Sequence, residues 1–548
     1  MNNINNINNS NIDIVYTYVS YRDKEWQKKY FKYCNNKKNI RYYSLNELEL
    51  SVKHTIKYCK FVRNIYIITD NQIPYWYSKN IYKNVFIIDH KTIFDDNCIY
   101  PNYNSNSIEC YIDNIPNLSD IFLYLNDDFF INISKSDLFD NNNIPYSFFK
   151  VKNWDFDLKY AKIKYKKKPA SLAIYNTIKL AEKYFKKKFN ISYIHQAYIL
   201  SKKGCKLTKQ IFNYEIKRKV KIRFREFLND DDIVYPLLCN IVSTEKNITK
   251  LKIFDNTKLI RFFINLNLKN SYRLNNILTN DYNFFCINDI KLNKELIDIY
   301  YKFSNNLRKK ISDKKNIIEI SVNQLLLINL DKLKNKLIKF NNNLSDNNFN
   351  ITRISAFDAD NISDNEFEIL KKNKNKFLGL LDTHKSQYAC WKSHIKCYEY
   401  IVNNFIEWCV VLEDDSLLKP GLSEKLKKFN IPHDTEIIFI HKRSEKCKKI
   451  KSNFKNVNIC VDGWGSDGYI ISYNCAKKIL DSIYSHIYFM QIDTMLFQMG
   501  KNYTKKFKSK YRTDLLKNNI KIKNIKLSIY LSKNSLLNEM NVKSTIKH

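Results

Sequence analysis

The chain has 548 residues, of which 44% are hydrophobic, so it can form about two to four domains with sizeable cores. Its net charge of +37 makes nucleic acid or an anionic membrane a candidate partner. The basic residues are mostly lysines spread along the chain among abundant Asn, Ile and Tyr, which favours a solvated lysine-rich surface over a nucleic-acid-binding patch. Phosphorylated donors and acidic glycans would also suit such a surface.

The cysteines and the apolar segments indicate the cellular compartment of the protein. Thirteen scattered cysteines include no CxxC pair, so zinc sites and a disulfide framework are both disfavoured, and a reducing, cytoplasmic location fits best. The Asn-rich head, residues 1–11, lacks the basic and apolar regions of a signal peptide and is expected to be disordered. No run of about eighteen apolar residues occurs, which leaves only a peripheral membrane contact open.

The first half alternates between strand and helix patterns. Short apolar runs predict buried strands, and periodic apolar residues predict helices between them. The strands are expected at residues 12–19, 64–70, 84–90 and 121–126, and the helices at 24–33 and 46–60. This order is typical of an α/β fold with a mostly parallel sheet.

Polar residues follow three of these strands, and ligands of open α/β sheets bind at the carboxyl ends of strands. The residues are Asp70, Asn71, Asp89, His90, Asn126, Asp127 and Asp128. The adjacent carboxylates of Asp127 and Asp128 repel one another unless a cation lies between them, and Mg²⁺ or Mn²⁺ would serve. The alternative is a solvated turn in which Asn and Asp have only a conformational role.

Several spaced motifs of this half together point to one family. They are Ile12–Asp23, Thr69–Trp76, Asp89–His90, Asn104–Glu109 and Tyr124–Asp128, with weaker ones at His195–Leu200, Arg223–Arg225 and Phe284–Asp289. These segments resemble the Stealth family of sugar-phosphate transferases. That family includes bacterial capsule polymerases and the animal enzyme that tags lysosomal glycoproteins with N-acetylglucosamine-1-phosphate.

Departures from the family pattern leave open a reduced or altered activity. Ala197 stands where the family has proline, and Tyr18 stands where tryptophan is usual. Glu49 stands where a basic residue is common, and Ile290 where another carboxylate is common.

The resemblance implies transfer of hexose-1-phosphate from a nucleotide sugar to a sugar hydroxyl. Asp127 and Asp128 would then hold the metal with Asn126, and His195 would be the base. Glu109 would orient the acceptor or replace His195 as the base. The expected substrate-binding residues are Asp70, Asn71, Gln72, Asp89, His90, Asn104, Ser105, Arg223 and Arg225. Without the resemblance, a packed His195 and a surface ion-pair role for the arginines remain open.

The second half begins after a lysine-rich helical pattern at 294–312, with a domain boundary expected near 313–316. Strands are expected at 317–321 or, preferably, 325–330, and then at 352–358, 408–413 and 436–441; helices are expected at 332–342, 386–403 and 476–483. The strand that starts at Trp408 ends in Glu413, Asp414 and Asp415, which repeats the acidic strand end of the first half.

A second set of spaced motifs occurs in this half. They are Ile328–Leu330, Arg353–Asp358, Ser393–His394, Val411–Asp415, Gly468–Ser472 with Ala476–Lys478, and Asp493. These motifs resemble the family 25 glycosyltransferases of lipopolysaccharide and collagen glycosylation. Lys336 departs from the usual arginine, and Ser386–Cys390 departs from the usual small-residue segment.

The second resemblance implies a nucleotide-sugar glycosyltransferase domain of the GT-A type. Asp415 is the first choice for its Mg²⁺ or Mn²⁺ ligand, supported by Glu413 and Asp414. Asp493 would be the base or bind the acceptor, and Gly468 would contact substrate. His394 fits a hydrogen-bonded core residue better than a functional one, and Asp493 as a plain surface residue stays open.

The sequence therefore predicts two Rossmann-like, mostly parallel α/β domains. We expect a head at 1–11, a Stealth-like domain at 12–292, a helical linker at 293–320, a glycosyltransferase domain at 321–505 and a basic tail at 506–548. The favoured function is a bifunctional enzyme that uses nucleotide-sugar donors and a glycan or glycoprotein acceptor. One alternative is a single active glycosyltransferase with a degenerate, glycan-binding Stealth-like module. A basic nucleic-acid or membrane-surface binder is the remote alternative, and no nucleic-acid partner is expected.

Overall fold

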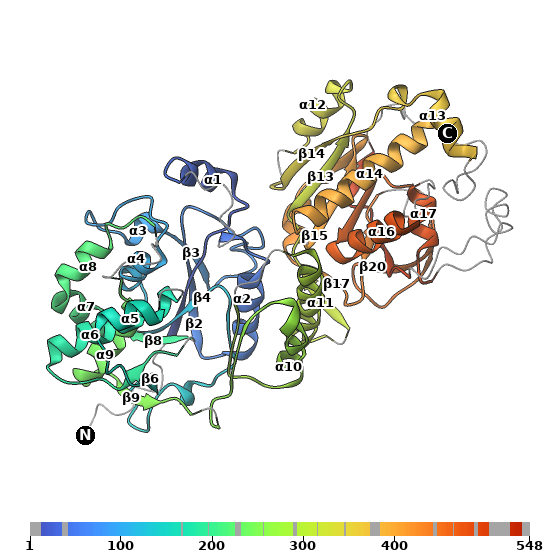
Figure 1. The fold of residues 1–548 in the computed structure, drawn as a ribbon. Helices are drawn as coiled ribbons and strands as arrows, with labels where there is room; N and C mark the ends of the chain where they lie inside the picture. The colour runs from blue at the N-terminus through green and yellow to red at the C-terminus, as the bar shows by residue number, and fades with distance from the viewer. Residues whose placement is uncertain are drawn as a thin grey trace. The chain divides into compact units, whose positions relative to one another are not determined.

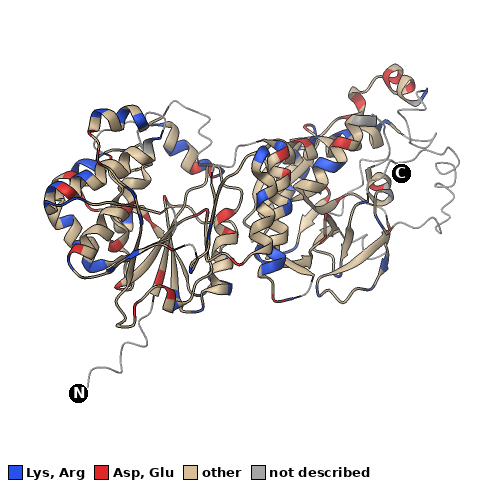
Figure 2. Ribbon diagram, turned by 60° about the horizontal axis from the view of Figure 1, so that its bottom comes forward, with Lys and Arg blue, Asp and Glu red and all other residues tan. Residues whose placement is uncertain are grey.

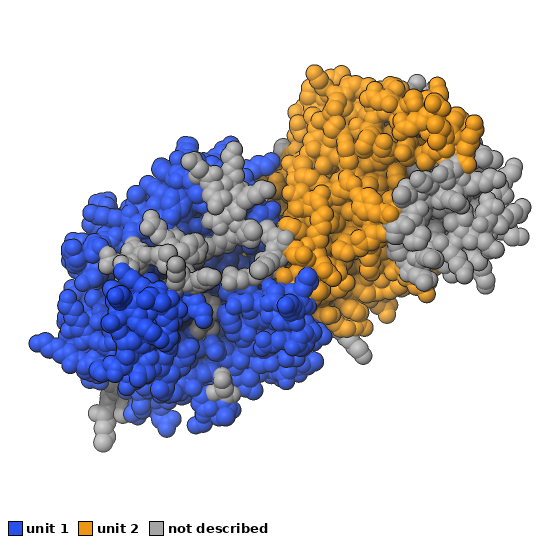
Figure 3. Space-filling view, in the orientation of Figure 1, with its two compact units in different colours: residues 1–74, 79–291 blue, residues 75–78, 292–548 orange. Residues whose placement is uncertain are grey.

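The chain divides into two compact units, residues 1–74 with 79–291 and residues 75–78 with 292–548 (Figure 3). The computed structural model describes residues 12–34, 42–165, 168–194, 197–224, 232–255, 257–288, 293–314, 316–344, 347–372, 384–441, 447–463, 465–486, 492–502 and 526–539. The predicted head at 1–11 lies outside them.

The first unit is built on a five-stranded sheet in the order β3-β2-β1-β4-β8 (Figure 1). Its strands are β1 (Ile12–Thr17), β2 (Val62–Thr69), β3 (Val85–Asp89), β4 (Ile121–Asn126) and β8 (Tyr198–Ser201). The first four run parallel, and β8 pairs antiparallel with β4. The apolar runs of β1 and β4 are buried because helices cover both faces of the sheet, which confirms the predicted α/β fold.

Neighbouring residues of β1 show how the two faces are covered. Val15 packs into a core formed with α4 (Ser105–Glu109), α6 (Pro169–Phe185), α7 (Lys202–Ile211) and α9 (Tyr235–Glu245). Tyr16 points to the other face, where its hydroxyl lies 2.9 Å from Ser51 Oγ and 3.0 Å from Thr55 Oγ1 of α2 (Glu47–Tyr58). Side chains alternate along a strand, so one strand contributes to both layers.

Smaller elements complete the first unit. The helices are α1 (Lys24–Phe31), α3 (His90–Ile93), α5 (Leu158–Tyr165), α8 (Asn213–Lys219) and α10 (Leu274–Thr279). Two three-stranded sheets have the orders β10-β11-β5 and β7-β6-β9. Their strands are β5 (Phe129–Ile131), β6 (Tyr146–Val151), β7 (Ile191–Ser192), β9 (Lys250–Ile253), β10 (Arg261–Asn265) and β11 (Phe284–Asn288).

The second unit contains an eight-stranded sheet in the order β14-β13-β15-β21-β18-β22-β20-β19. Its strands are β13 (Gln324–Asn329), β14 (Asn350–Ser355), β15 (Trp408–Glu413), β18 (Ile437–Phe439), β19 (Lys448–Ile450), β20 (Val457–Asp462), β21 (Gly468–Ser472) and β22 (Ile529–Ser532). The strands β14, β13 and β15 are parallel, and β21 runs antiparallel to β15 and β18. The second unit is thus also α/β, with a parallel part that ends at Glu413.

In the described part of the second unit, seven helices and two strand pairs surround that sheet. The helices are α11 (Lys294–Ile311), α12 (Lys334–Asn342), α13 (Asp364–Lys372), α14 (Lys385–Asn403), α16 (Tyr473–His486) and α17 (Ile492–Gln498), together with the short α15 (Leu422–Lys427). The strand β12 (Ile317–Ile320) pairs with β17 (Phe429–Pro432), and β16 (Ser416–Leu418) pairs with β23 (Leu537–Glu539).

Two segments differ from the domain limits that we expected. The expected linker, 293–320, contains α11, whose Arg308 forms a buried ion pair of 3.0 Å with Glu407, so this helix belongs to the body of the second unit. The expected basic tail, 506–548, contains β22, which lies inside the large sheet between β18 and β20. Ile529 and Tyr530 of β22 are buried there, so this part of the expected tail belongs to the folded second unit.

Basic residues occur on helices of both units rather than on a single element (Figure 2). All thirteen cysteines are free thiols. Among the described residues, no helix combines the length and the apolar character needed to cross a bilayer.

Candidate active sites

The carboxyl edge of the first sheet brings together the polar strand ends that the sequence indicated. Thr17 pairs with Asn126 on the neighbouring strand, and Thr69 pairs with Asp89. Because these strands are parallel, Asp70, Asp89 and Asn126 lie along one edge of the sheet. We call this edge, together with the adjoining residues Glu109, Asp127 and Asp128, the first rim.

At one end of the first rim, Asp70 is buried and lies 2.7 Å from Lys29 Nζ. Its Oδ1 atom also accepts a hydrogen bond of 2.9 Å from the hydroxyl of Tyr100. Next to it, burial lowers the pKa of His90 to about 4, although Asp70 and Asp89 act in the opposite direction. His90 is therefore neutral at physiological pH.

Other predicted substrate-binding residues stabilise the local backbone structure. Asp89 caps α3 by accepting from the backbone N–H of Lys91 at 2.8 Å. Gln72 holds the loop after β1, because its side chain accepts from Ser20 N at 2.7 Å and donates to Ser20 O at 2.9 Å. Asn71 is exposed in the left-handed region, with φ of 56°.

The middle of the first rim contains a hydrogen-bonded carboxylate. The hydroxyl of Tyr124 donates to Glu109 Oε1 at 3.0 Å and lies 3.2 Å from Thr17 Oγ1 and 3.3 Å from Asn126 Oδ1. Glu109, at the end of α4, is thereby fixed beside the strand ends. Asn104 caps the same helix by accepting from Asn106 N at 3.2 Å, and Ser105 is the first residue of the helix.

At the other end of the first rim, Asp127 and Asp128 form the turn between β4 and β5. Burial, followed by the charges of Asp128 and Glu47, raises the pKa of Asp127 well above its ordinary value. The thiol of Cys286 donates to Asp128 Oδ2 at 3.3 Å. This concentration of carboxylates disfavours ionisation, and a hard divalent cation is the group that would relieve it, so the donor set fits Mg²⁺ or Mn²⁺.

Two contacts hold the side chain of Arg223 against the protein. Its guanidinium lies 3.9 Å from the centre of the Tyr33 ring, and its Nη1 atom donates to Pro101 O at 2.6 Å. His195 and Arg225 lie outside the described residues, so their roles stay predictions.

The second unit gathers its predicted acidic residues around one end of β15. Glu413 Oε1 accepts from Ser466 Oγ at 2.7 Å and lies 3.2 Å from His394 Nε2. Burial raises the pKa of the Cys390 thiol, and the neighbouring charges of Glu413, Asp493 and Asp415 add to that effect. Glu413, Asp415 and Asp493 therefore all lie near Cys390, and we call these four residues the second rim.

Two loop contacts position Asp493 and separate Asp414 from the second rim. Asp493 Oδ2 accepts from Gly465 N at 3.1 Å, and Gly465 has a φ of 93° that favours glycine. Asp414 forms a buried ion pair of 2.9 Å with Lys336, and its other oxygen accepts from Asn329 Nδ2 at 2.9 Å. With both oxygens engaged by protein donors, Asp414 fits an internal anchor better than the predicted metal ligand.

Gly468 has a packing role, and its predicted contact with substrate stays a prediction. It is buried at the start of β21, where a Cβ atom would overlap Leu537 Cδ1 and lie 3.1 Å from Leu412 Cδ2. The glycine is needed here because the neighbouring side chains pack directly over the strand.

Sequence reasoning did not place Glu47, Ser466 or Cys390 beside the acidic strand ends. Glu47 begins α2 and Ser466 lies just before β21. Both are far along the chain from the acidic strand ends, so no local sequence pattern connects them. Cys390 and His394 carried a signal, because residues four apart share one face of a helix.

Two regions of the chain match known families. Residues 41–147 match Stealth protein CR2, conserved region 2, and residues 322–496 match glycosyltransferase family 25, LPS biosynthesis protein. One region of the chain is similar to the Stealth family and another to the family 25 glycosyltransferases. Both predicted resemblances are thereby confirmed, and each match covers the acidic strand end of its unit.

Curated relatives match part of the chain. The capsular polysaccharide phosphotransferase fcs1 of Haemophilus influenzae is 38% identical over 226 residues, which cover 39% of this chain and 60% of that protein. The capsular polysaccharide phosphotransferase LcbA of Neisseria meningitidis is 33% identical over 224 residues, with coverage of 39% and 60%. The chain thus spans about 60% of the length of these relatives.

Solved structures with distant similarity are glycosyltransferases. GlyE of Streptococcus pneumoniae TIGR4 aligns with a TM-score of 0.26 and 11% identity, covering 74% of this chain and 91% of that chain. The bifunctional glycosyltransferase WbbM aligns with a TM-score of 0.25 and 10% identity, covering 86% of this chain and 81% of that chain.

Proposed function

We propose that the protein is a glycan-building transferase with two centres. The first unit transfers hexose-1-phosphate from a nucleotide sugar to a sugar hydroxyl, and the second transfers a sugar from a nucleotide sugar to a glycan or glycoprotein. The observation that carries the proposal is that each unit gathers carboxylates at the carboxyl end of its own parallel strands. Thirteen free thiols fit a reducing compartment such as the cytoplasm.

In the first unit, the proposed reaction requires a positioned hydroxyl, a proton acceptor and charge neutralisation at a diphosphate. Glu109 is fixed by Tyr124 beside the strand ends, which suits it to orient the acceptor hydroxyl or to take its proton. His195 is the other proposed base. Lys29 and Arg223 supply positive charge near the rim for the donor phosphates.

In the second unit, the acceptor hydroxyl attacks the anomeric carbon and a nucleoside diphosphate leaves. Asp493 is the proposed base or acceptor-binding residue, because the backbone of Gly465 fixes its carboxylate at the second rim. Asp415 is the proposed metal ligand. In both units, Mg²⁺ or Mn²⁺ held by these carboxylates would neutralise the diphosphate of the donor.

The nucleotide that is released distinguishes the two centres. The purified chain is incubated with Mg²⁺ or Mn²⁺, a sugar acceptor mixture and individual nucleotide sugars, and the products are separated by chromatography. The first centre should release nucleoside monophosphate and the second nucleoside diphosphate. Asp128→Asn should lower only monophosphate release, and Asp415→Asn only diphosphate release, each by about 100-fold or more.

Asp155→Asn is the matched control, because Asp155 is an exposed carboxylate paired only at the surface with Lys188. This variant should leave both products unchanged. Undiminished monophosphate release by Asp128→Asn would refute the proposed metal ligand of the first unit. Metal-dependent binding of the donor without any monophosphate release would favour a glycan-binding module in that unit instead.

A further inference from the structure

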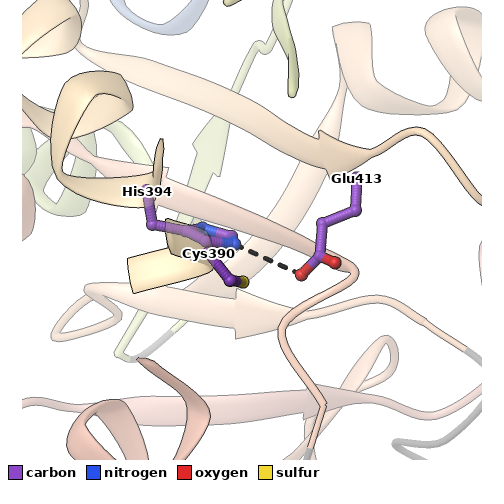
Figure 4. Close-up of side chains that lie close together, drawn as sticks. All are labelled: Cys390, His394 and Glu413. Carbon is purple, nitrogen blue, oxygen red and sulfur yellow. Dashed lines mark hydrogen bonds and ion pairs between the residues drawn. The ribbon is translucent and has the colours of Figure 1, made fainter. Parts of the chain in front are cut away.

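Three chemically different ligand groups meet at the second rim. Cys390 and His394 are four residues apart on α14 and face the same way, and Glu413 ends β15. Figure 4 shows the three side chains converging from these two elements. The ligand atoms of the cysteine, the histidine and the glutamate all lie within 4.8 Å of one another. Across the described parts of the chain, no other group of three Cys, His, Asp or Glu side chains meets that condition.

The surroundings fix the imidazole of His394 in the orientation that a metal ligand needs. This side chain is fully buried, and its Nδ1 atom lies 2.7 Å from the hydroxyl of Tyr469. The hydroxyl of Tyr398 lies 2.9 Å from the same tyrosine and supports it. His394 Nε2 consequently faces the carboxylate of Glu413. Histidines that bind metal ions usually have their other ring nitrogen engaged in this way.

Glu413 has a supporting contact of its own, the hydrogen bond of 2.7 Å from Ser466 Oγ to Oε1. Ligating carboxylates are commonly held by such outer hydrogen bonds. The helix α14 and the strand β15 thus supply three ligand groups, and hydrogen bonds already orient the histidine and the glutamate.

We propose that Cys390 Sγ, His394 Nε2 and the Glu413 carboxylate form a binding site for a divalent cation of the zinc class. Zn²⁺ accepts sulfur, nitrogen and oxygen ligands together, and three protein ligands leave a fourth position for water or substrate. Mg²⁺ takes oxygen ligands and does not select a thiolate. The site shares the second rim with the Mg²⁺ or Mn²⁺ proposed at Asp415, and the test of zinc-class binding needs neither donor nor acceptor.

The proposal revises an expectation from the sequence. Without a CxxC pair, the cysteines gave no reason to expect zinc. Here the ligands come instead from a Cys-x-x-x-His pair on one helix and a carboxylate at a strand end. The competing interpretation is a hydrogen-bonded core cluster in which the thiol keeps its proton.

Cobalt substitution tests the proposal directly. The full chain is stripped of metal with a chelator, and Co²⁺ is added while the absorption spectrum is recorded. We expect one equivalent of Co²⁺ to give a thiolate-to-cobalt charge-transfer band and the visible absorption of a four-coordinate ion. Equimolar Zn²⁺ should remove both signals, whereas a large excess of Mg²⁺ should not.

Variants assign the band to its ligands. Cys390→Ser should abolish the charge-transfer band, and His394→Gln should weaken Co²⁺ affinity by about 10-fold or more. Cys34→Ser is the matched control, because Cys34 is also half-buried but belongs to the first unit, and it should keep the band.

A wild-type chain without the band, or a Cys390→Ser chain that keeps it, would overturn the site. The wild-type titration needs no variant, so a folding defect in a variant does not leave the proposal untested. The absorption readout also needs neither donor nor acceptor, so failure of the nucleotide-release experiment would not affect it.

Discussion

His90 shows how burial at the first rim sets a charge state. Its pKa is lowered to about 4 from an ordinary value of 6.5, because the imidazolium would lose its hydration at this position. Between these two pH values the unfolded chain binds a proton that the folded chain does not. The contribution of His90 to stability is therefore complete above pH 6.5 and is lost as the pH falls toward 4.

Removing His90 should remove this pH dependence. From pH 7 to pH 5, the wild-type chain should lose about 2 kcal/mol of unfolding free energy that His90→Gln does not lose. Denaturant unfolding of the first unit at the two pH values measures the difference. If the free energy of unfolding changed equally with pH in the wild type and the variant, the imidazole would not be desolvated as described.

Gly468 allows packing to be separated from substrate binding. Gly468→Val should destabilise the second unit by about 1–3 kcal/mol, because the new side chain would overlap Leu537. Thermal unfolding measures this loss. Adding Leu537→Ala should restore part of it, since the two side chains compete for one space. A weakened donor affinity at unchanged stability would instead support the substrate-binding role that the sequence suggested.

At the scale of elements, strands with unbroken apolar runs could be predicted from the sequence. Most residues of β1, β4, β13 and β15 lie within the segments expected for them. Each of these strands is buried on both faces, so its apolar run can be recognised in the sequence without knowledge of its partner strands. The strand β22 was not predicted. It is four residues long and follows a lysine-rich stretch, and only its pairing with β18 and β20 makes it a strand.

The same distinction applies to the candidate sites. Acidic strand ends are local patterns, so Asp70, Asp127 and Glu413 could be placed at sheet edges from the sequence. Contacts made by side chains distant in sequence could not. The engagement of Asp414 by Lys336 and Asn329 depends on how β13, α12 and β15 pack, so no local pattern could show that protein donors contact both oxygens of this predicted metal ligand.

The position of β22 predicts unequal effects of two truncations. A chain that ends at residue 525 lacks an interior strand and should leave β18 and β20 with unpaired backbone edges, so the second unit should not fold and the product should aggregate. A chain that ends at residue 539 keeps every strand described here and should remain soluble. Soluble yield and circular dichroism distinguish the two, and a folded product ending at 525 would contradict the role of β22.

At the scale of the molecule, each unit has its own large hydrophobic core. One core extends from Val15 to Val242 and the other from Ile318 to Leu537, and they share no residue. Domains with separate cores can unfold separately, so a single free energy of unfolding does not describe the chain.

Calorimetry should therefore resolve two unfolding transitions. Arg308→Met should lower only the transition of the second unit, by about 3–5 kcal/mol, because it removes the buried cation that neutralises the carboxylate of Glu407. Lys188→Met is the control, since its ion pair with Asp155 is exposed to solvent and should leave both transitions unchanged. A single transition that shifts as a whole with Arg308→Met would contradict independent unfolding.

The late place of β22 in the chain also sets an order of events during translation. The first unit has all of its described strands once residue 288 has left the ribosome, and it can fold while the rest is being made. The second unit must hold an incomplete sheet until β22 emerges. From the end of β20 at residue 462 to the end of β22 at residue 532 the ribosome adds about 70 residues, which at about 5–20 residues per second takes roughly 4–14 seconds. During that interval the open edges of β18 and β20 are the part of the nascent chain that most needs chaperone protection.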